Sequence, residues 1–208
     1  MTTPVMELLR DSTAELHTSA EANEFQHQLG SGKVDKKHFS RYLEQLYLMH
    51  KRLADLLNES KPANHAVNHV VKDYHLDLSC LSKDLAYFGQ KPDGASPLKA
   101  TAKLMDSMKS TAQNDTAALL GYLYVLEGST NGAKFMAKAL RAGLELPEDA
   151  GASYFDRYGD AQRERWTAFK TAMNELDFSE KERDSLVTRA QEIFHSFGEI
   201  GTELLSEN

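Results

Sequence analysis

The chain has 208 residues, 41% of them hydrophobic, which suits one globular domain. Its formal net charge of −7 argues against a nucleic-acid partner. A single cysteine, Cys80, excludes an internal disulfide framework and a cysteine zinc site, and it fits a reducing compartment. With no signal peptide and no run of 18 apolar residues, we expect a cytoplasmic protein without a membrane partner.

Helical spacing of apolar residues recurs along the chain, and no segment alternates as a half-buried strand does. Turns or loops are expected at residues 30–33, 90–97 and 147–151. The last helix follows Ser179, which forms a capping box with Glu182. The other predicted helices cover 4–21, 36–58, 63–73, 77–88, 98–111, 115–143 and 159–176. We therefore predict a single all-α domain over residues 1–208, a bundle of seven to nine helices.

One predicted helix contains a sequence that is typical of a helix end. Residues 121–140 read GYLYVLEGSTNGAKFMAKAL, and each of the glycines Gly128 and Gly132 costs roughly 0.5–1 kcal/mol relative to alanine. A close helix–helix crossing explains the pair, and so does a flat ligand that lies against the helix. Ser129, Thr130 and Asn131 offer hydroxyl and amide groups for backbone that a kink would free.

Most of the eight histidines carry no clear functional signal. His65 and His69 have the i, i+4 spacing of a chelating pair, but their segment is polar, which favours a solvated face. His50 and His195 lie on apolar stripes, so we expect both to be core residues with hydrogen-bond partners.

His17 is the more informative histidine. It lies where the apolar face of the first helix runs past Leu16, with Arg10 two turns earlier and Glu21 one turn later. A neutral imidazole is a usual axial ligand of haem iron, and a carboxylate one turn on could orient its ring. The alternative is a histidine in the core. Together with the glycine pair, His17 favours a haem site.

These residues resemble a known family. The segments ELHTSAE (15–21) and YLYVLEGSTNGAKF (122–135) are similar to the haem oxygenases, particularly the small bacterial branch that forms biliverdin. The similarity continues through residues 170–190 and covers roughly 5–205. Both motifs occur in order, in a chain of this length and predicted helix content.

The resemblance implies a role for each matching residue. His17 corresponds to the proximal iron ligand and Glu21 to the acid one turn on, while Gly128 and Gly132 correspond to the glycines of a kinked distal helix. The mammalian-type enzymes have an aspartate at the position of Gly128, so another group must hold the distal water. The other residues implied in binding haem or holding water are Arg10, Lys138 and Lys170 for the propionates, Tyr122 on the distal side, and Glu127, Ser129 and Asn131 near the kink.

The resemblance also implies an activity. Haem would be both cofactor and substrate, with the iron held by His17, and O₂ and external electrons would convert it to biliverdin, free iron and CO. Ferredoxin or flavodoxin with its reductase is the implied electron donor, and we expect a monomer or weak dimer. A basic patch for this donor is available from Lys33, Lys36, Lys37, Lys51 and Arg52.

Three alternatives remain open at this stage. The chain could bind or store haem without turnover, using the same His17 and kink. It could be another enzyme on the same helical scaffold, as in thiaminase-like proteins, for which Cys80 is a weak candidate. It could also be an interaction module in which the glycine pair serves only packing.

Overall fold

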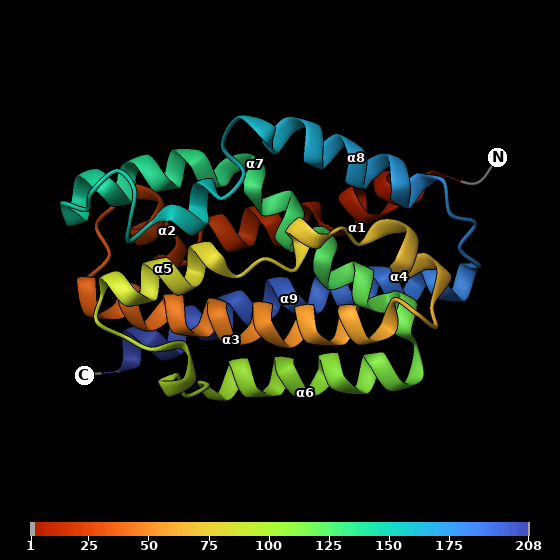
Figure 1. Ribbon diagram of the computed structural model, residues 1–208, viewed down its shortest axis with the longest axis horizontal. Coiled ribbons are helices and arrows are strands. Elements are labelled where there is room, and N and C mark those ends of the chain that lie inside the picture. The colour runs from red at the N-terminus through yellow and green to blue at the C-terminus, as the bar shows by residue number, and fades with distance from the viewer. Residues whose placement is uncertain (1–2, 208) are drawn as a thin grey trace.

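The computed structural model describes residues 3–207, and in that part the chain forms nine α-helices and no strand (Figure 1). None of these helices is long and apolar enough to cross a membrane. The all-α prediction is confirmed, at the upper end of the expected number of helices. The helices are α1 (Val5–Glu21), α2 (Glu24–Ser31), α3 (Lys36–Ser60), α4 (His65–Val70), α5 (Ser79–Tyr87), α6 (Lys99–Asn114), α7 (Leu119–Leu144), α8 (Gln162–Asn174) and α9 (Glu180–Ser206).

Short polar side chains begin several of these helices. Asn23, Asp35 and Asn64 accept hydrogen bonds from the first backbone N–H groups of α2, α3 and α4. The predicted capping box of Ser179 and Glu182 is present at the start of α9. Each cap satisfies N–H groups that the helix itself leaves unpaired, so these starts are set by local sequence.

The core lies where the apolar stripes of α3, α7 and α9 meet. α9 packs against α1, α6 and α7, and thereby joins the two sides of the bundle. In Figure 1, α3 and α6 lie below α7 and α8. Full burial of each large aliphatic side chain contributes roughly 1.5–3 kcal/mol. On α9 large buried aliphatic positions recur every four or seven residues: Leu186, Ile193, Ile200 and Leu204.

The structure differs from the predicted elements in three places. α2 was not predicted, because it is short and buries only Phe25 and Leu29. The predicted helix at 63–73 is shorter, since α4 ends at Val70 and a 3₁₀ turn η1 (Asp73–His75) follows. The predicted helix at 159–176 begins instead as a 3₁₀ turn η5 (Gly159–Ala161), and another turn, η4 (Ser153–Asp156), precedes it.

Several glycines allow helices to approach closely. A Cβ on Gly143 of α7 would overlap the backbone carbonyl of Gly32, which follows α2 with a φ of 69°. A Cβ on Gly121 would overlap the carbonyl oxygen of Leu186 on α9. The close crossings of α7 therefore use Gly121 and Gly143.

Candidate functional site

His17 lies on the part of α1 that extends beyond the core. The first half of α1 is buried through Val5, Leu9 and Thr13, whereas the side chain of His17 is 64% exposed. The interpretation of His17 as a core histidine is therefore wrong. Its exposure leaves the imidazole accessible to a ligand.

Two side chains lie beside the ring of His17. The ring meets that of Phe194 on α9 edge to face, with 6.1 Å between centroids. Its Nδ1 atom lies 3.6 Å from Oε1 of Glu21. Since Nδ1 faces the carboxylate, Nε2 is the ring nitrogen left for a metal. The orienting role expected of Glu21 stays a prediction.

The chain approaches α7 at a point before this histidine, on α1, and again after it, beyond α2. The side chain of Tyr124 on α7 lies beside that of Thr13 on α1, which is one turn before His17. At the other end, Gly32 packs against Ala139 and Gly143 of α7. The chain between Thr13 and Gly32 therefore runs alongside the part of α7 between Tyr124 and Ala139.

Between these two contacts each chain segment has a stretch that is open to solvent. Thr18, Ser19 and Glu21 on α1 are exposed, as are Asn131 and Gly132 on α7. Phe135, further along α7, is 80% exposed. We call these two largely exposed stretches, residues 17–21 and 128–135, the α1–α7 opening. It is the candidate functional site.

The glycine pair of the opening is not used for packing. A Cβ built on Gly132 would meet no atom within 4 Å, and one on Gly128 would meet only Cη2 of Trp166, at an ordinary contact distance of 3.6 Å. A close helix crossing through this pair is therefore wrong. Their bare surface instead leaves room for something that is not part of the described chain.

α7 stays α-helical through the opening, yet the direction of its axis changes there. Three successive side chains, Ser129, Thr130 and Asn131, each donate a hydrogen bond to the carbonyl three residues earlier, at 2.8, 2.6 and 2.8 Å. Figure 1 shows the ribbon of α7 bending between a steep green part and a nearly level teal part. These side chains bind carbonyls of the bend, as the sequence predicted.

The three predicted cations lie on α1, α7 and α8 and differ in their surroundings. Arg10 is exposed and pairs with Asp11 at 2.8 Å and Glu7 at 3.5 Å, and these carboxylates raise its pKa. Lys170 of α8 is half-buried, with Nζ 5.8 Å from the ring of Trp166, the residue that Gly128 faces. Lys138 is exposed on α7, one turn beyond the opening.

Two other predicted residues have partners outside the opening. The Tyr122 side chain is fully buried, and its hydroxyl lies 2.6 Å from Glu192 on α9 and 3.1 Å from Ser107 on α6. Oδ1 of Asn131 accepts a hydrogen bond of 2.8 Å from Gln162 at the start of α8. The structure therefore ties these two side chains to the bundle.

Glu127 is the functional candidate whose position the sequence left undecided. It does not reach solvent: its side chain is 1% exposed, and its Oε1 lies 2.7 Å from Nη2 of Arg157. The hydroxyl of Tyr158 donates to the same oxygen at 3.0 Å. Burial raises the pKa of Glu127, and the charge of Arg157 opposes that shift.

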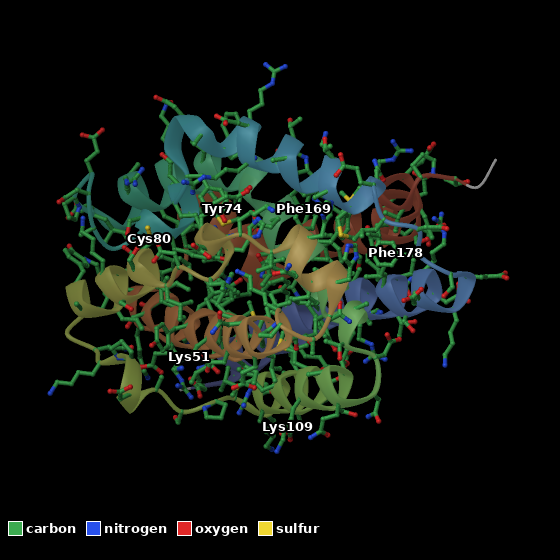
Figure 2. The ribbon with its side chains drawn as sticks, turned by 45° about the vertical axis from the view of Figure 1, so that its right-hand side comes forward. Lys51, Tyr74, Cys80, Lys109, Phe169 and Phe178 are labelled. Atoms are coloured by element: carbon green, nitrogen blue, oxygen red, sulfur yellow. The ribbon has the colours of Figure 1, made fainter. Side chains whose placement is uncertain are left out.

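A buried histidine lies beside this ion pair. His75 Nδ1 accepts a hydrogen bond from the backbone N–H of Lys72, so Nε2 carries the proton, and it lies 3.8 Å from Oε2 of Glu127. Tyr74 and Phe169, labelled in Figure 2, contact the His75 ring edge to face. Burial, aided by the charge of Arg157, lowers the pKa of His75 to about 3.

Two cavities border this region without enclosing His17. A groove of about 470 Å³ runs between α1 and α9, and its wall includes Leu16 and Phe194. A second, of about 260 Å³, lies beside Asn131, Phe135 and Arg157. Leu16 is the chain neighbour of His17 and Phe194 is its ring partner, so the groove adjoins the opening on the α1 side.

The remaining predicted side chains have ordinary surroundings. His69 hydrogen bonds with Glu175 at 3.0 Å on the surface, and the described residues contain no group of three metal-ligating side chains. His50 is buried and bonded to Tyr154 at 2.6 Å, as expected of a core histidine, whereas His195 is exposed, so its core prediction was wrong.

Cys80 does not have the environment of a nucleophile. It is half-buried, and burial together with the nearby Asp84 raises the pKa of its thiol. A reactive cysteine needs the opposite shift, toward the thiolate. The structure thus gives no support to chemistry at Cys80.

The chain was compared with known proteins. A sequence model of the family described as "Heme oxygenase" matches residues 3–203. Heme oxygenase 2 from Rattus norvegicus is 26% identical over 205 residues, which cover 95% of this chain and 64% of the rat protein. Heme oxygenase from Guillardia theta is 24% identical over 196 residues, which cover 90% of this chain and 80% of the other.

Solved structures share the fold. Heme oxygenase from Leptospira interrogans superposes with a TM-score of 0.89 at 23% identity, covering 97% of this chain and all of the other. Heme oxygenase-2 from Synechocystis sp. PCC 6803, in complex with heme and NO, gives 0.90 at 23% identity, covering 98% and 86%. A TenA homologue from P.horikoshii OT3 gives 0.67 at 15% identity, so related bundles also occur under another name.

These likenesses differ in what they establish. At identities below 25% the solved structures show the fold, whereas the family model matches nearly the whole chain. This chain spans about 64% of the length of the rat relative. The chain belongs to the haem oxygenase family.

Proposed function

We propose that this protein is a haem oxygenase, which opens the haem macrocycle with O₂ and externally supplied electrons to give biliverdin, free iron and CO. Family membership supports the reaction class. The α1–α7 opening supplies the support from geometry, because it combines an exposed imidazole with a bare helix surface. The single cysteine favours a cytoplasmic site for this reaction.

One observation carries the proposal. In the stretch of α7 alongside His17, Gly132 has no atom within 4 Å of a built Cβ, and Gly128 has only the tip of Trp166. The chain retains two glycines where protein packing would tolerate alanine. A flat macrocycle against the helix explains them, because it needs the helix backbone within contact distance.

The donor set also fits haem. Nε2 of His17 would hold the iron, while Glu21 at 3.6 Å from Nδ1 keeps the ring oriented. Phe194 provides an apolar edge beside the imidazole. Haem, when bound, supplies the iron that activates O₂ and the ring that is oxidised.

Cations near the opening would fix the orientation of the macrocycle through its propionates. Lys170 is the strongest candidate, because it is half-buried beside Trp166, the residue that Gly128 faces. Arg10 already shares its charge with Asp11 and Glu7, so a propionate would compete with two carboxylates. Lys138 would bind a propionate at the far end of the opening.

The bend of α7 would provide the distal surface. Backbone groups of Gly128 and Gly132 can approach the ligand, and the hydroxyl of exposed Ser129 can exchange its bond to the Leu126 carbonyl for one to water. Asn131 would help to hold the distal water from its position against Gln162. We assign Tyr122 to the packing that supports this helix from behind, since Glu192 and Ser107 hold its hydroxyl.

Electrons would come from a separate protein, ferredoxin or flavodoxin with its reductase. Lys33, Lys36 and Lys37 lie together where the chain passes from α2 to α3, which offers a basic patch to an acidic donor. Lys51 is a weaker candidate, because Asp55 pairs with it at 2.8 Å. We propose a monomer or weak dimer as the working form.

The decisive experiment adds hemin to the purified protein and then supplies oxygen with ascorbate or ferredoxin and its reductase. A Soret band typical of histidine ligation, followed by its loss and the rise of a biliverdin band, supports the proposal. A stable Soret band under reducing conditions indicates a haem-binding or storage protein instead. Failure to form any Soret band contradicts both.

A further inference from the structure

Glu127 is the last residue before the glycines at which α7 is held by buried contacts from other parts of the chain. Its Oε1 atom accepts hydrogen bonds from Arg157 Nη2 at 2.7 Å and from the Tyr158 hydroxyl at 3.0 Å. Both donors belong to the segment between α7 and α8. This contact therefore fixes the point at which the bend of α7 begins.

Arg157 is itself held rigidly. Its side chain is 7% exposed, and its guanidinium lies over the rings of Tyr154 and Tyr158, at 5.5 and 4.7 Å from their centroids. The Tyr154 hydroxyl is bonded to Nε2 of His50, on α3, at 2.6 Å. Glu127 is thus connected through Arg157 to the central helix α3.

A second set of contacts holds the same segment to α5. Asp84 is fully buried and accepts hydrogen bonds from the backbone N–H groups of Ser153 and Tyr154, at 2.9 and 2.8 Å. These bonds fix the start of η4, three residues before Arg157. The cation that faces Glu127 is therefore a fixed reference point within the bundle.

The residues after Glu127 have weaker connections. Ser129, Thr130 and Asn131 donate hydrogen bonds to carbonyls of α7 itself. Gln162 donates to the side chains of Thr130 and Asn131, at half-buried and exposed positions. Gly132 faces open space. The position of this stretch therefore depends on the fixed contacts at its two ends, and the buried contact of Glu127 is the one directly before it.

An ion pair serves this purpose better than an apolar contact. A buried carboxylate–guanidinium pair adds little net stability over well-packed apolar side chains, because both charges lose their hydration. Its hydrogen bonds are nevertheless short and directional, so they fix both distance and rotation. An apolar residue at 127 would allow the helix to slide.

We propose that Glu127 is a positioning residue which, through Arg157 and Tyr158, holds the backbone of Gly128–Gly132 in place across the α1–α7 opening from His17. The benefit to haem rests on the proposed function. The anchoring itself is a property of the protein without ligand, so the two can be tested separately.

Hydrogen–deuterium exchange on the full chain without haem tests the anchoring. In Glu127→Gln, amides of residues 128–136 should exchange about tenfold faster than in the wild type, while those of α3 and α9 keep their protection. Glu44→Gln is the matched control, since it breaks a half-buried ion pair with Arg41 inside α3. Unchanged exchange over 128–136 in folded Glu127→Gln overturns the proposal.

A milder variant keeps the test valid if Glu127→Gln does not fold. Tyr158→Phe removes one hydrogen bond to Glu127, of 3.0 Å to Oε1, together with the 3.3 Å bond of the same hydroxyl to the Tyr74 carbonyl, and it leaves the ion pair. It should raise exchange over 128–136 about threefold, in line with the loss of one hydrogen bond. Unchanged amide exchange over 128–136 in Tyr158→Phe also overturns the anchoring.

A spectroscopic measurement tests the consequence for haem. The protein is loaded with hemin, reduced and exposed to CO, and the C–O stretching band is recorded. Glu127→Gln should broaden or shift this band, because the distal backbone samples several positions, and Glu44→Gln should match the wild type. Identical bands overturn the positioning role. Failure of the wild type to bind hemin instead overturns the proposed function and leaves the exchange result standing.

Discussion

The two halves of α7 contrast in how they are held. From Leu119 to Glu127 every side chain is buried or half-buried, Gly121 lies against the backbone of α9, and Glu127 closes the half with a buried ion pair. From Gly128 to Met136 the helix is largely exposed. Full burial returns at Ala137, just before Gly143 meets Gly32.

This contrast shows that glycine has two opposite uses within one helix. Gly121 and Gly143 permit protein to touch protein, while Gly128 and Gly132 keep a surface bare between two fixed ends. The same residue type therefore indicates close packing in one half and, in the other, an unpacked surface that we propose as the ligand surface. The predictions below separate these uses.

The largest effect should come from the residue alongside the bare surface. His17→Ala should reduce ring opening by more than about 100-fold, since loss of an outer partner of a metal ligand alone costs about 10–100-fold. Unfolding free energy should change by less than about 0.5 kcal/mol, because the side chain is 64% exposed. Biliverdin formation and urea denaturation measure the two quantities.

Thr18→Ala is the control for that variant. Thr18 is the exposed neighbour of His17, and its hydroxyl bonds only within α1, at 3.2 Å to Ala14. It should retain wild-type turnover. Normal ring opening by His17→Ala would remove the proximal assignment and with it the functional meaning of the open half.

The anchored half should give the protein an acid-sensitive stability. The pKa of His75 is about 3 when folded, against 6.5 as its ordinary value, so the unfolded chain binds the proton first. The contribution of His75 to the free energy of unfolding is therefore fully present above about pH 6.5. It falls by about 1 kcal/mol per pH unit as the pH drops toward 3. His75→Gln should flatten this part of the profile.

Urea denaturation from pH 7 to pH 4 measures that effect. The comparison uses the difference between the two slopes, so groups common to both proteins cancel. Glu127, Arg157, Lys72 and Arg165 all act on His75 and remain in the variant. Parallel profiles would show that His75 does not titrate as its burial implies.

The closely packed contact of α7 should resist any added atom. A Cβ at Gly143 meets the backbone of Gly32, which cannot rotate away as a flexible side chain would. Gly143→Ala should destabilise the fold by about 1–3 kcal/mol, as measured by urea denaturation. An unchanged midpoint would mean that α2 and α7 are less tightly joined than their backbone approach indicates.

Sequence alone predicted the features that depend on local pattern. Apolar spacing gave the all-α fold, and Ser179 with Glu182 marked the start of α9. The apolar stripe of α9 runs through Ile193 and Ile200, and His195 lies two residues from the first of these. That offset turns its side chain outward, which the prediction of a core histidine overlooked.

Features that depend on distant contacts could not be predicted in this way. The local sequence around Glu127 does not indicate whether its carboxylate contacts water or Arg157, because Arg157 lies 30 residues later in the chain. The spacing of Gly128 and Gly132 fits a helix crossing and a ligand surface equally well. Only the atoms around each built Cβ distinguish them. An acid inside an apolar run, just before glycines, was the one available signal.

The smallest expected effect is the sharpest test of the contrast. Gly132→Ala should stabilise the protein by about 0.5–1 kcal/mol, because the position is helical and open. It should also lower ring opening about tenfold, since the methyl group would hold the macrocycle away from the backbone. Gly198→Ala, on α9, is the matched control. Gly198 is also a helical glycine, and a Cβ added to it would meet nothing within 4 Å beyond its own helix, so this variant should gain stability without losing activity.

Opposite signs for stability and activity at Gly132, and not at Gly198, would show that α7 gives up stability for a bare surface. That outcome cannot arise from packing, because packing would move both quantities in one direction. If Gly132→Ala keeps full turnover, the glycine is not needed for close approach to haem. The proposed function would then rest on His17 and on family membership alone.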